Sequence, residues 1–340
     1  MILVKKNLIK RIIIITVVIN VVIFLAISAK ITFEKTKEEF AKRMPSIPSF
    51  SMPLSGGSSK TACSDTSDYH AKILYARAKD ATSGFGEMST KLRGWFKSAD
   101  GILNEEAKKF NMSASLKVFC ENGEISITEV ILPNTEKFYS SSSDTRGVLV
   151  AALTTLGYNK KNEKYIVYYD GSALGCKING VDQPCVSQQT EKGPDDRLIE
   201  GNVYNLGPDY AFLYKVDDVT VQQYFGASYD MLAPVLILHE YAHTMGAVQS
   251  SAPHSTKKES QSKQKHCNDS PTLGKGGTDI MCKSDGEGEV FGNACSGMYP
   301  FVFDCNNDDY FNPKPEPGSY LATHWNLGSE LNHFIQFGEK

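Results

Sequence analysis

The 340-residue sequence lacks several features that would place it in common functional classes. It has 36 basic and 39 acidic residues, so no positive surplus is present for a phosphate backbone, and we expect no nucleic-acid partner. It shows no internal repeat that would bind a cell-wall polymer, and no Cys-x-x-Cys pair typical of structural zinc. A hydrophobic content of 41% argues against a disordered chain and for a full core.

A long apolar run occupies residues 12–28 and follows the basic residues Lys5, Lys6, Lys10 and Arg11. Its length suits either a signal-peptide core or a short membrane-spanning helix. Because positive charges stay on the cytoplasmic side, both interpretations place the rest of the chain outside the cytoplasm. We therefore predict a signal anchor or signal peptide over residues 1–29, and a protein that is membrane-anchored or secreted.

Residues 30–59 pass from a charged stretch into PSIPSFSMPLSGGSS, whose proline, serine and glycine favour an extended linker. We predict that residues 60–340 form one folded domain, and that this domain is a monomer.

The eight cysteines all follow the apolar run, which agrees with an oxidising compartment. Eight cysteines allow 105 pairings, so the connectivity does not follow from the sequence. We expect neighbours to pair, as Cys63–Cys120, Cys176–Cys185, Cys267–Cys282 and Cys295–Cys305.

The order of hydrophobic patterns predicts an α+β domain, with a mixed sheet packed on helices. Beyond Gly246 the sequence becomes loop-rich, which predicts an irregular, disulfide-stapled C-terminal half. The expected elements are a strand in 69–80, a helix in 87–111 interrupted at Gly101, strands in 116–120 and 124–133, a helix in 145–157, strands in 164–171 and 209–218, and a helix in 231–246.

The last of these helices carries HEYAHTMG, residues 239–246. On a helix His239 and His243 lie one turn apart and point the same way, so both imidazoles reach one metal ion. Glu240 lies about 100° around the helix, where its carboxylate reaches a water on that ion rather than the ion itself. Zinc acidifies such a water and a carboxylate takes its proton, so these residues predict hydrolysis with Glu240 as general base.

HEYAHTMG together with TDIMC (278–282) resembles the metzincin clan of zinc endopeptidases, whose motif is HExxHxxGxxH with a Met-turn beneath the metal. With HCNDS and FDCNNDDYFNPKPEPGSYLATHWN, the sequence is similar to a group of secreted bacterial proteins of that plan. The resemblance covers roughly residues 230–326. It implies an upper sheet-and-helix half, an irregular lower half, a zinc ion between them, and Met281 as the Met-turn residue.

The third zinc ligand departs from the family spacing, which places Gln249 where a histidine is expected. Glutamine is a poor zinc ligand beside imidazole or carboxylate. We predict His254 as the third ligand, with His266, Asp279 and Gln249 as alternatives. His266 and Asp279 are also candidates for residues that orient a ligand without touching the metal.

DCNNDDYFNP, residues 304–313, offers the oxygen donors Asp304, Asn306 and Asp308 at the alternate spacing of calcium loops. The glycine and distal glutamate of the complete calcium-loop pattern are absent. We predict a hydrogen-bonded turn here, with a structural Ca²⁺ site as the alternative.

These residues together predict a zinc-dependent endopeptidase that acts on protein or peptide substrates. Two alternatives remain at this point. One is a catalytically inactive, metal-stabilised binding module at the cell surface, and the other is a zinc amidase that cleaves cell-wall peptide cross-links.

Overall fold

The computed structural model of the chain describes residues 62–65, 68–174, 176–178, 181–183, 185–225, 227–256, 266–267, 278–282 and 301–339. All of them belong to one unit of the chain, Met52–Lys340. The predicted segments 1–29 and 30–59 lie outside the described residues, so the domain boundary near residue 60 stays a prediction. Among the described helices, none has the length and apolar character needed to span a bilayer.

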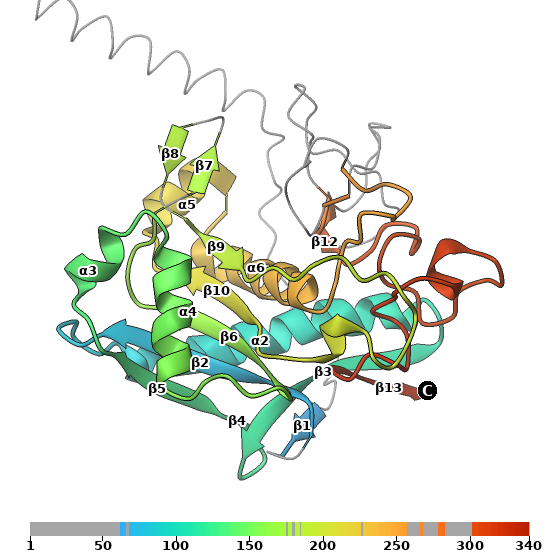
Figure 1. Ribbon diagram of the computed structural model, residues 1–340, viewed down its shortest axis with the longest axis horizontal. Helices are drawn as coiled ribbons and strands as arrows, with labels where there is room; N and C mark the ends of the chain where they lie inside the picture. The colour runs from blue at the N-terminus through green and yellow to red at the C-terminus, as the bar shows by residue number, and fades with distance from the viewer. Residues whose placement is uncertain are drawn as a thin grey trace, which may run out of the picture. The chain divides into compact units, whose positions relative to one another are not determined.

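A mixed sheet of nine strands forms the centre of the described part of the chain (Figure 1). The main order is β1-β3-β2-β6-β10-β9, in which the pairs from β1 to β10 are parallel and β9 is antiparallel to β10. In addition, β4 and β13 pair with β3 in antiparallel fashion, and β5 pairs with β2 in parallel fashion. The strands are β1 Ala62–Ser64, β2 His70–Ala78, β3 Met112–Glu121, β4 Glu124–Ile125, β5 Ile127–Leu132, β6 Glu163–Tyr169, β9 Ser187–Gln189, β10 Tyr210–Tyr214 and β13 Ile335–Glu339.

Helices cover both faces of this sheet, so the predicted mixed sheet packed on helices is confirmed, but the arrangement is that of an α/β rather than an α+β fold. Alternation along β2 sends Ile73 and Tyr75 into a core shared with α2 and α6, and Leu74 and Ala76 into a second core shared with α4. The remaining elements are α2 Phe85–Lys108, α3 Glu136–Ser140, α4 Thr145–Thr155, α5 Asp218–Phe225, α6 Tyr229–Thr244, the 3-10 turns η1 Val203–Asn205 and η2 Tyr320–Ala322, and the short strands β7 Cys176–Ile178, β8 Val181–Gln183, β11 Thr278–Asp279 and β12 Phe301–Val302.

The predicted interruption of α2 at Gly101 is wrong, because α2 continues without a break to Lys108. Its buried face runs from Leu92 through Phe96 to Leu103, on both sides of the glycine. Packing of this face therefore outweighs the modest helix-destabilising effect of one glycine, about 1 kcal/mol.

The residues at the two ends of helix α6 explain where the helix begins and where it ends. The Ser228 hydroxyl accepts a hydrogen bond from the amide of Met231 at its start. At its end Gly246 adopts φ +101°, which an L side chain rarely adopts. A Cβ at Gly246 would also lie 2.7 Å from the rings of Tyr204 and Trp325. Glycine is therefore required at the exit of the helix.

A buried lysine anchors the C-terminal end of α6 to the sheet. The Lys164 ammonium donates to the carbonyl of Thr244 at 2.7 Å and to the Asp209 carboxylate. Burial lowers the pKa of Lys164 to about 8, although the Asp209 carboxylate opposes that shift. A cation at a helix C-terminus also interacts favourably with the helix dipole, so Lys164 holds the turn that carries His243 against β6.

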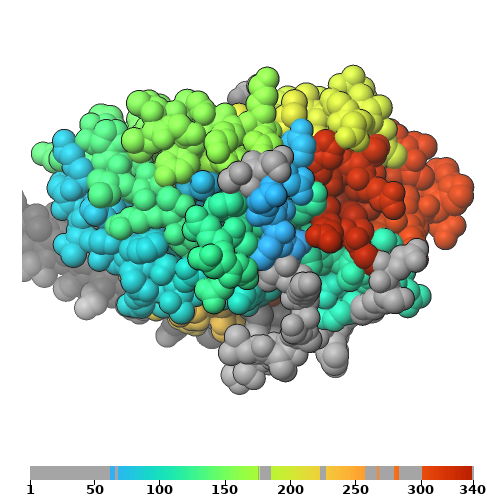
Figure 2. All heavy atoms as spheres, turned by 90° about the horizontal axis from the view of Figure 1, so that it is seen from below, coloured from blue at the N-terminus to red at the C-terminus, as the bar shows by residue number. Residues whose placement is uncertain are grey.

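The C-terminal residues return to the sheet beside the first strands. On the face drawn in Figure 2 the last residues (red) lie next to the first described ones (blue). Strand β13 pairs with β3, and the ring of Tyr69 lies 5.6 Å from that of Phe334, centroid to centroid. The C-terminal segment is thus joined to the sheet by strand β13.

Three predicted disulfides are confirmed, namely Cys63–Cys120, Cys176–Cys185 and Cys267–Cys282. Cys305 is also disulfide-bonded. Its predicted partner Cys295 lies outside the described residues. Disulfides persist in oxidising compartments, so they support the predicted location outside the cytoplasm.

Acid is expected to destabilise the domain through Glu163 at the start of β6. Burial raises the pKa of this carboxyl. Hydrogen bonds with the side chains of His70, Tyr165 and Lys160 outweigh that effect, and the pKa falls from 4.5 to about 2. A carboxyl whose pKa is lower in the folded state stabilises above pH 4.5, and this stability is lost as the pH falls from 4.5 to about 2. The loss amounts to about 3 kcal/mol.

Denaturant unfolding of the full chain at several acidic pH values measures this effect. Glu163→Gln should unfold with a shallower pH dependence below pH 4.5, whereas Glu330→Gln at an exposed position should behave like the unmodified chain. Equal slopes in all three proteins would show that Glu163 does not carry the acid sensitivity.

Candidate metal centre

Helix α6 presents two histidines from one face, as the HExxH spacing predicts. His239 and His243 are separated by one turn, and their ring centroids lie 4.8 Å apart with perpendicular ring planes. His243 is buried and His239 is partly buried. Both side chains therefore lie on the same side of a helix whose other faces are packed in the core.

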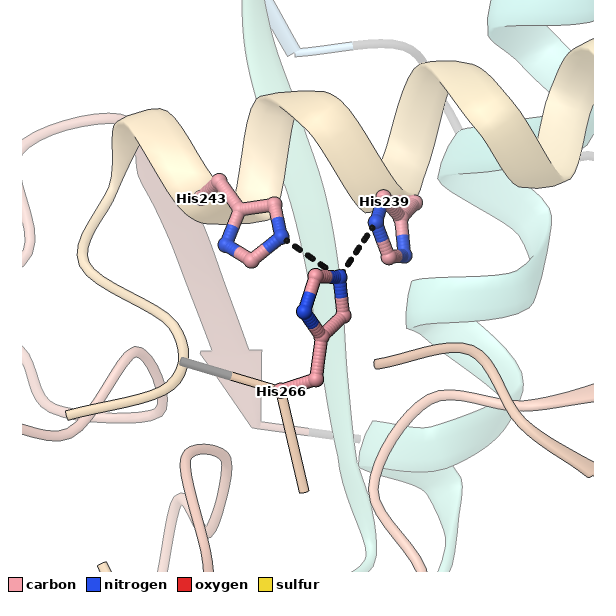
Figure 3. Close-up of side chains that lie close together, drawn as sticks. All are labelled: His239, His243 and His266. Carbon is pink, nitrogen blue, oxygen red and sulfur yellow. Dashed lines mark hydrogen bonds between the residues drawn. The ribbon is translucent and has the colours of Figure 1, made fainter. Parts of the chain in front are cut away.

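A third imidazole, from His266, meets these two (Figure 3). Its Nε2 lies 3.3 Å from Nε2 of His243 and 3.3 Å from Nε2 of His239. The three potential ligand atoms all lie within 4.8 Å of one another. Three imidazole nitrogens are one of the protein donor sets of catalytic zinc sites.

The protons on these rings indicate that the cluster fits a metal ion. The Nδ1 of His239 lies 2.5 Å from the carbonyl oxygen of Ile280, and that of His243 lies 2.6 Å from the carbonyl oxygen of Ala247. Because a carbonyl only accepts, both Nδ1 atoms donate, and in the neutral rings both Nε2 atoms present lone pairs. The His266 Nε2 carries at most one proton for the two lone pairs facing it. A bound cation satisfies all three nitrogens.

Glu240, the predicted general base, is buried on the same helix as His239 and His243. Its side chain is held by the Ser187 hydroxyl, which donates to Glu240 Oε1 at 2.6 Å. Ser187 begins β9, the antiparallel edge strand of the sheet. The carboxylate is therefore fixed between helix α6 and the sheet edge, and it is buried.

The segment Thr278–Cys282 contacts the histidine cluster and helps to orient it. Its Ile280 carbonyl accepts from His239, and its Met281 carbonyl accepts from the amide of Cys267, the residue after His266. The disulfide Cys267–Cys282 joins the same two pieces of chain. Met281 is fully buried in the core that includes residues of α6. Its predicted Met-turn role stays a prediction.

Asp279 maintains the shape of this segment through three hydrogen bonds. Its carboxylate accepts from the amides of Met281 and Cys305 and from the hydroxyl of Tyr310, at 2.7–2.8 Å. Asp279 also lies near Cys267 and Cys282, but those sulfurs are bonded to each other, which removes them as thiolate ligands. Of its two predicted roles, these contacts favour support of the site over metal ligation.

The other predicted third ligands, His254 and Gln249, make different contacts. The imidazole of His254 donates to the Asp309 carboxylate at 3.0 Å and belongs to a separate cluster with Asp308 and Asp309. The Gln249 amide nitrogen donates to the carbonyl of Gly246 at 2.6 Å. Among the described candidates it is His266, not His254, that meets His239 and His243.

The predicted calcium residues do not converge on one point. Asp304 is buried, and its Oδ2 accepts the amides of Tyr310 and Phe311, which closes the predicted hydrogen-bonded turn. Burial and the nearby Asp279 carboxylate raise the pKa of Asp304 well above its ordinary value. Asn306 has φ 62° and turns the chain, while Asp308 lies near His254. These contacts give a calcium site no support.

Three contributors to the centre were missed by the sequence analysis. Ser187 lies in a polar stretch without a motif, and nothing in its spacing links it to Glu240. The carbonyls of Ile280 and Ala247 orient the imidazoles, but a backbone carbonyl has no sequence signature. A histidine next to a cysteine that pairs across a loop is the one signal that pointed to His266.

No family model and no curated protein sequence matches this chain. Solved structures with some similarity include OgpA from Akkermansia muciniphila, at 12% identity over 57% of this chain and 52% of that chain, with a TM-score of 0.33. OgpA has also been solved in catalytically inactive form with an O-glycopeptide substrate. Archaemetzincin from Methanopyrus kandleri matches at 14% identity over 63% of this chain and 82% of that chain, with a TM-score of 0.30. The chain thus spans about half the length of OgpA, and similarity this weak assigns no family.

Proposed function

We propose that this chain is a zinc-dependent endopeptidase whose metal ligands are His239, His243 and His266. The convergence of three Nε2 atoms is the observation that supports the proposal. In two of the rings, His239 and His243, the Nδ1–H group donates a hydrogen bond to a backbone carbonyl. Hydrogen bonds of this kind fix the orientation of zinc-binding imidazoles and raise their basicity. In this proposal His266 replaces His254 as the third ligand.

The chemistry divides between the ion and the carboxylate. His239, His243 and His266 would hold a zinc ion, which would supply a Lewis acid for water and for the scissile carbonyl. Glu240 takes the proton of the attacking water and returns it to the leaving amine. Ser187 holds the carboxylate in one orientation during this transfer, and the burial of Glu240 keeps competing water away.

The edge of the sheet supports a peptide as the substrate. In the described part of the chain β9 pairs with β10 on one side and with no strand on the other. An extended peptide adds readily to such an edge through backbone hydrogen bonds. Since Ser187 of β9 contacts Glu240, a peptide bound along β9 would pass close to the general base.

The domain is further proposed to act as a monomer outside the cytoplasm, secreted or attached by residues 1–29. The disulfides Cys63–Cys120, Cys176–Cys185 and Cys267–Cys282 support that compartment. Met281 is proposed as the Met-turn residue beneath the zinc.

Removal of zinc from the full chain with a chelator is expected to abolish hydrolysis of an unfolded protein such as casein, and added Zn²⁺ should restore it. The assay compares casein with peptidoglycan before chelation, after chelation and after zinc is returned. Hydrolysis that survives complete metal removal would contradict the proposal.

The same assay separates the competing functions. Release of cross-link peptides from peptidoglycan, with casein intact, would identify the amidase. Stoichiometric zinc without hydrolysis of either substrate would favour the inactive binding module. The buried Glu240 carboxylate beside three imidazoles favours the peptidase, because a purely structural zinc site has no use for a general base.

A further inference from the structure

A second cluster of metal-ligating side chains lies outside the proposed zinc centre. It brings together His254, from the loop after α6, with Asp308 and Asp309, which follow more than fifty positions later in the chain. His254 Nδ1 lies 3.0 Å from Asp309 Oδ2 and 3.8 Å from Asp308 Oδ1. One potential ligand atom from each residue lies within 4.8 Å of the other two.

The two carboxylates of this cluster differ in exposure. The Asp309 side chain is fully buried, whereas the Asp308 side chain is 42% exposed, although its Oδ1 atom is buried. Among the described residues, none donates a hydrogen bond to Asp308 Oδ1. Desolvation of an anionic oxygen is costly, and the charged neighbour of this atom, His254 at 3.8 Å, is shared with Asp309, so a bound cation would stabilise Asp308 Oδ1.

A histidine–aspartate ion pair alone does not account for the arrangement. Both carboxylate oxygens of Asp309 already accept hydrogen bonds from His254: Oδ1 from the backbone amide and Oδ2 from the imidazole Nδ1. One imidazolium carries one positive charge, whereas Asp308 and Asp309 carry two negative charges. Burial raises the pKa of both carboxyls, and the Asp309 charge raises that of Asp308 further. A divalent cation would neutralise both carboxylates.

We propose that His254, Asp308 and Asp309 form a second binding site for a divalent transition-metal ion of the Zn²⁺ class. The donor set is one imidazole nitrogen and two carboxylate oxygens. An imidazole donor suits zinc and its neighbours, whereas calcium prefers oxygen donors throughout. Binding replaces the Nδ1 proton of His254 by the metal, and that proton leaves to solvent.

This site would join two loops of the irregular lower half. His254 follows the zinc-binding helix, and Asp309 precedes Tyr310, whose hydroxyl holds the Asp279 carboxylate. Asp279 in turn accepts the Met281 amide within the segment that contacts His239. A metal ion at the second site would therefore stabilise the lower half and the support of the first centre, without touching substrate.

The test titrates the metal-stripped full chain with ZnCl₂ in a calorimeter and counts the zinc ions bound. Asp308→Asn and His254→Gln remove one donor each at partly exposed positions, so folding should survive, and circular dichroism checks that it does. Glu316→Gln, at an exposed position, is the matched control. His243→Ala reports on the proposed zinc centre alone.

The unmodified chain and Glu316→Gln are expected to bind one more zinc ion than Asp308→Asn or His254→Gln. Zinc should also raise the Tm of the unmodified chain more than that of either variant, and CaCl₂ should not compete. Equal zinc counts and equal Tm shifts in the unmodified chain and both variants would overturn the second site. His243→Ala separates the two proposals, because failure of the first centre leaves its count equal to that of the unmodified chain.

Discussion

Glu240→Gln is expected to lower kcat/KM for a peptide substrate by about 100-fold to 10,000-fold. Glutamine keeps the size of the side chain and still accepts the hydroxyl of Ser187, which donates to Glu240 Oε1. It does not take a proton from water, so the substitution removes the proposed acid–base step and leaves the metal ligands intact. Zinc content should match that of the unmodified chain.

The comparison needs a control for non-specific effects of losing a carboxylate. Glu330→Gln removes an exposed carboxylate from the same domain and should retain full activity. A Glu240→Gln protein that holds zinc and cleaves as fast as Glu330→Gln would show that another group takes the proton. That result would contradict the mechanism while leaving the metal site untouched.

His266→Ala is expected to have the second large effect, on the metal. Loss of a residue that only orients a ligand typically lowers metal affinity by 10-fold to 100-fold. Loss of a direct ligand should cost more, so we expect His266→Ala to raise the zinc concentration for half-maximal recovery of peptidase activity by more than about 100-fold. Titration of the metal-stripped enzyme with zinc, read out by peptide hydrolysis, measures this concentration.

Substitutions of two other histidines serve as comparisons for the zinc requirement of His266→Ala. His254→Ala should change the zinc requirement far less, because the His254 imidazole lies with Asp309 rather than with His239. His324→Ala removes a partly exposed histidine that stacks on Tyr320, and it serves as the matched control. A larger effect at His254 than at His266 would return the third ligand to the residue that sequence spacing favours.

Local features of the fold were accessible from the sequence because they depend on neighbouring residues. The one-turn spacing that puts His239 and His243 on one side of a helix follows from helix geometry, and the structure has it. Gly101 shows the limit of such reasoning. Whether a glycine breaks a helix depends on how the flanking turns pack, which the local pattern does not record.

The third ligand depends on tertiary structure, which explains why its position was predicted less well. His254 is the next histidine after the motif, but Asp309, a residue 55 positions away, binds its imidazole. His266 reaches the site because its neighbour Cys267 is tied to Cys282, beside Met281. Competition between distant partners of this kind has no signature in the linear spacing of a single sequence.

The proposed general base, Glu240, was found from the sequence motif, but its hydrogen-bond partner was not. Glu240 is defined by its place in the helix, whereas its partner Ser187 comes from an edge strand 53 residues earlier. Likewise, the carbonyls of Ile280 and Ala247 act through backbone positions that any residue type would supply. The motif therefore predicts the candidate reactive side chains, but it does not predict the groups that hydrogen-bond to them.

Anomalous diffraction at the zinc absorption edge, from crystals of the zinc-loaded chain, locates the metal and its ligands. We expect a zinc peak about 2.0–2.1 Å from the Nε2 atoms of His239, His243 and His266. A peak coordinated by His239, His243 and a residue other than His266, or no peak at these histidines, would contradict it.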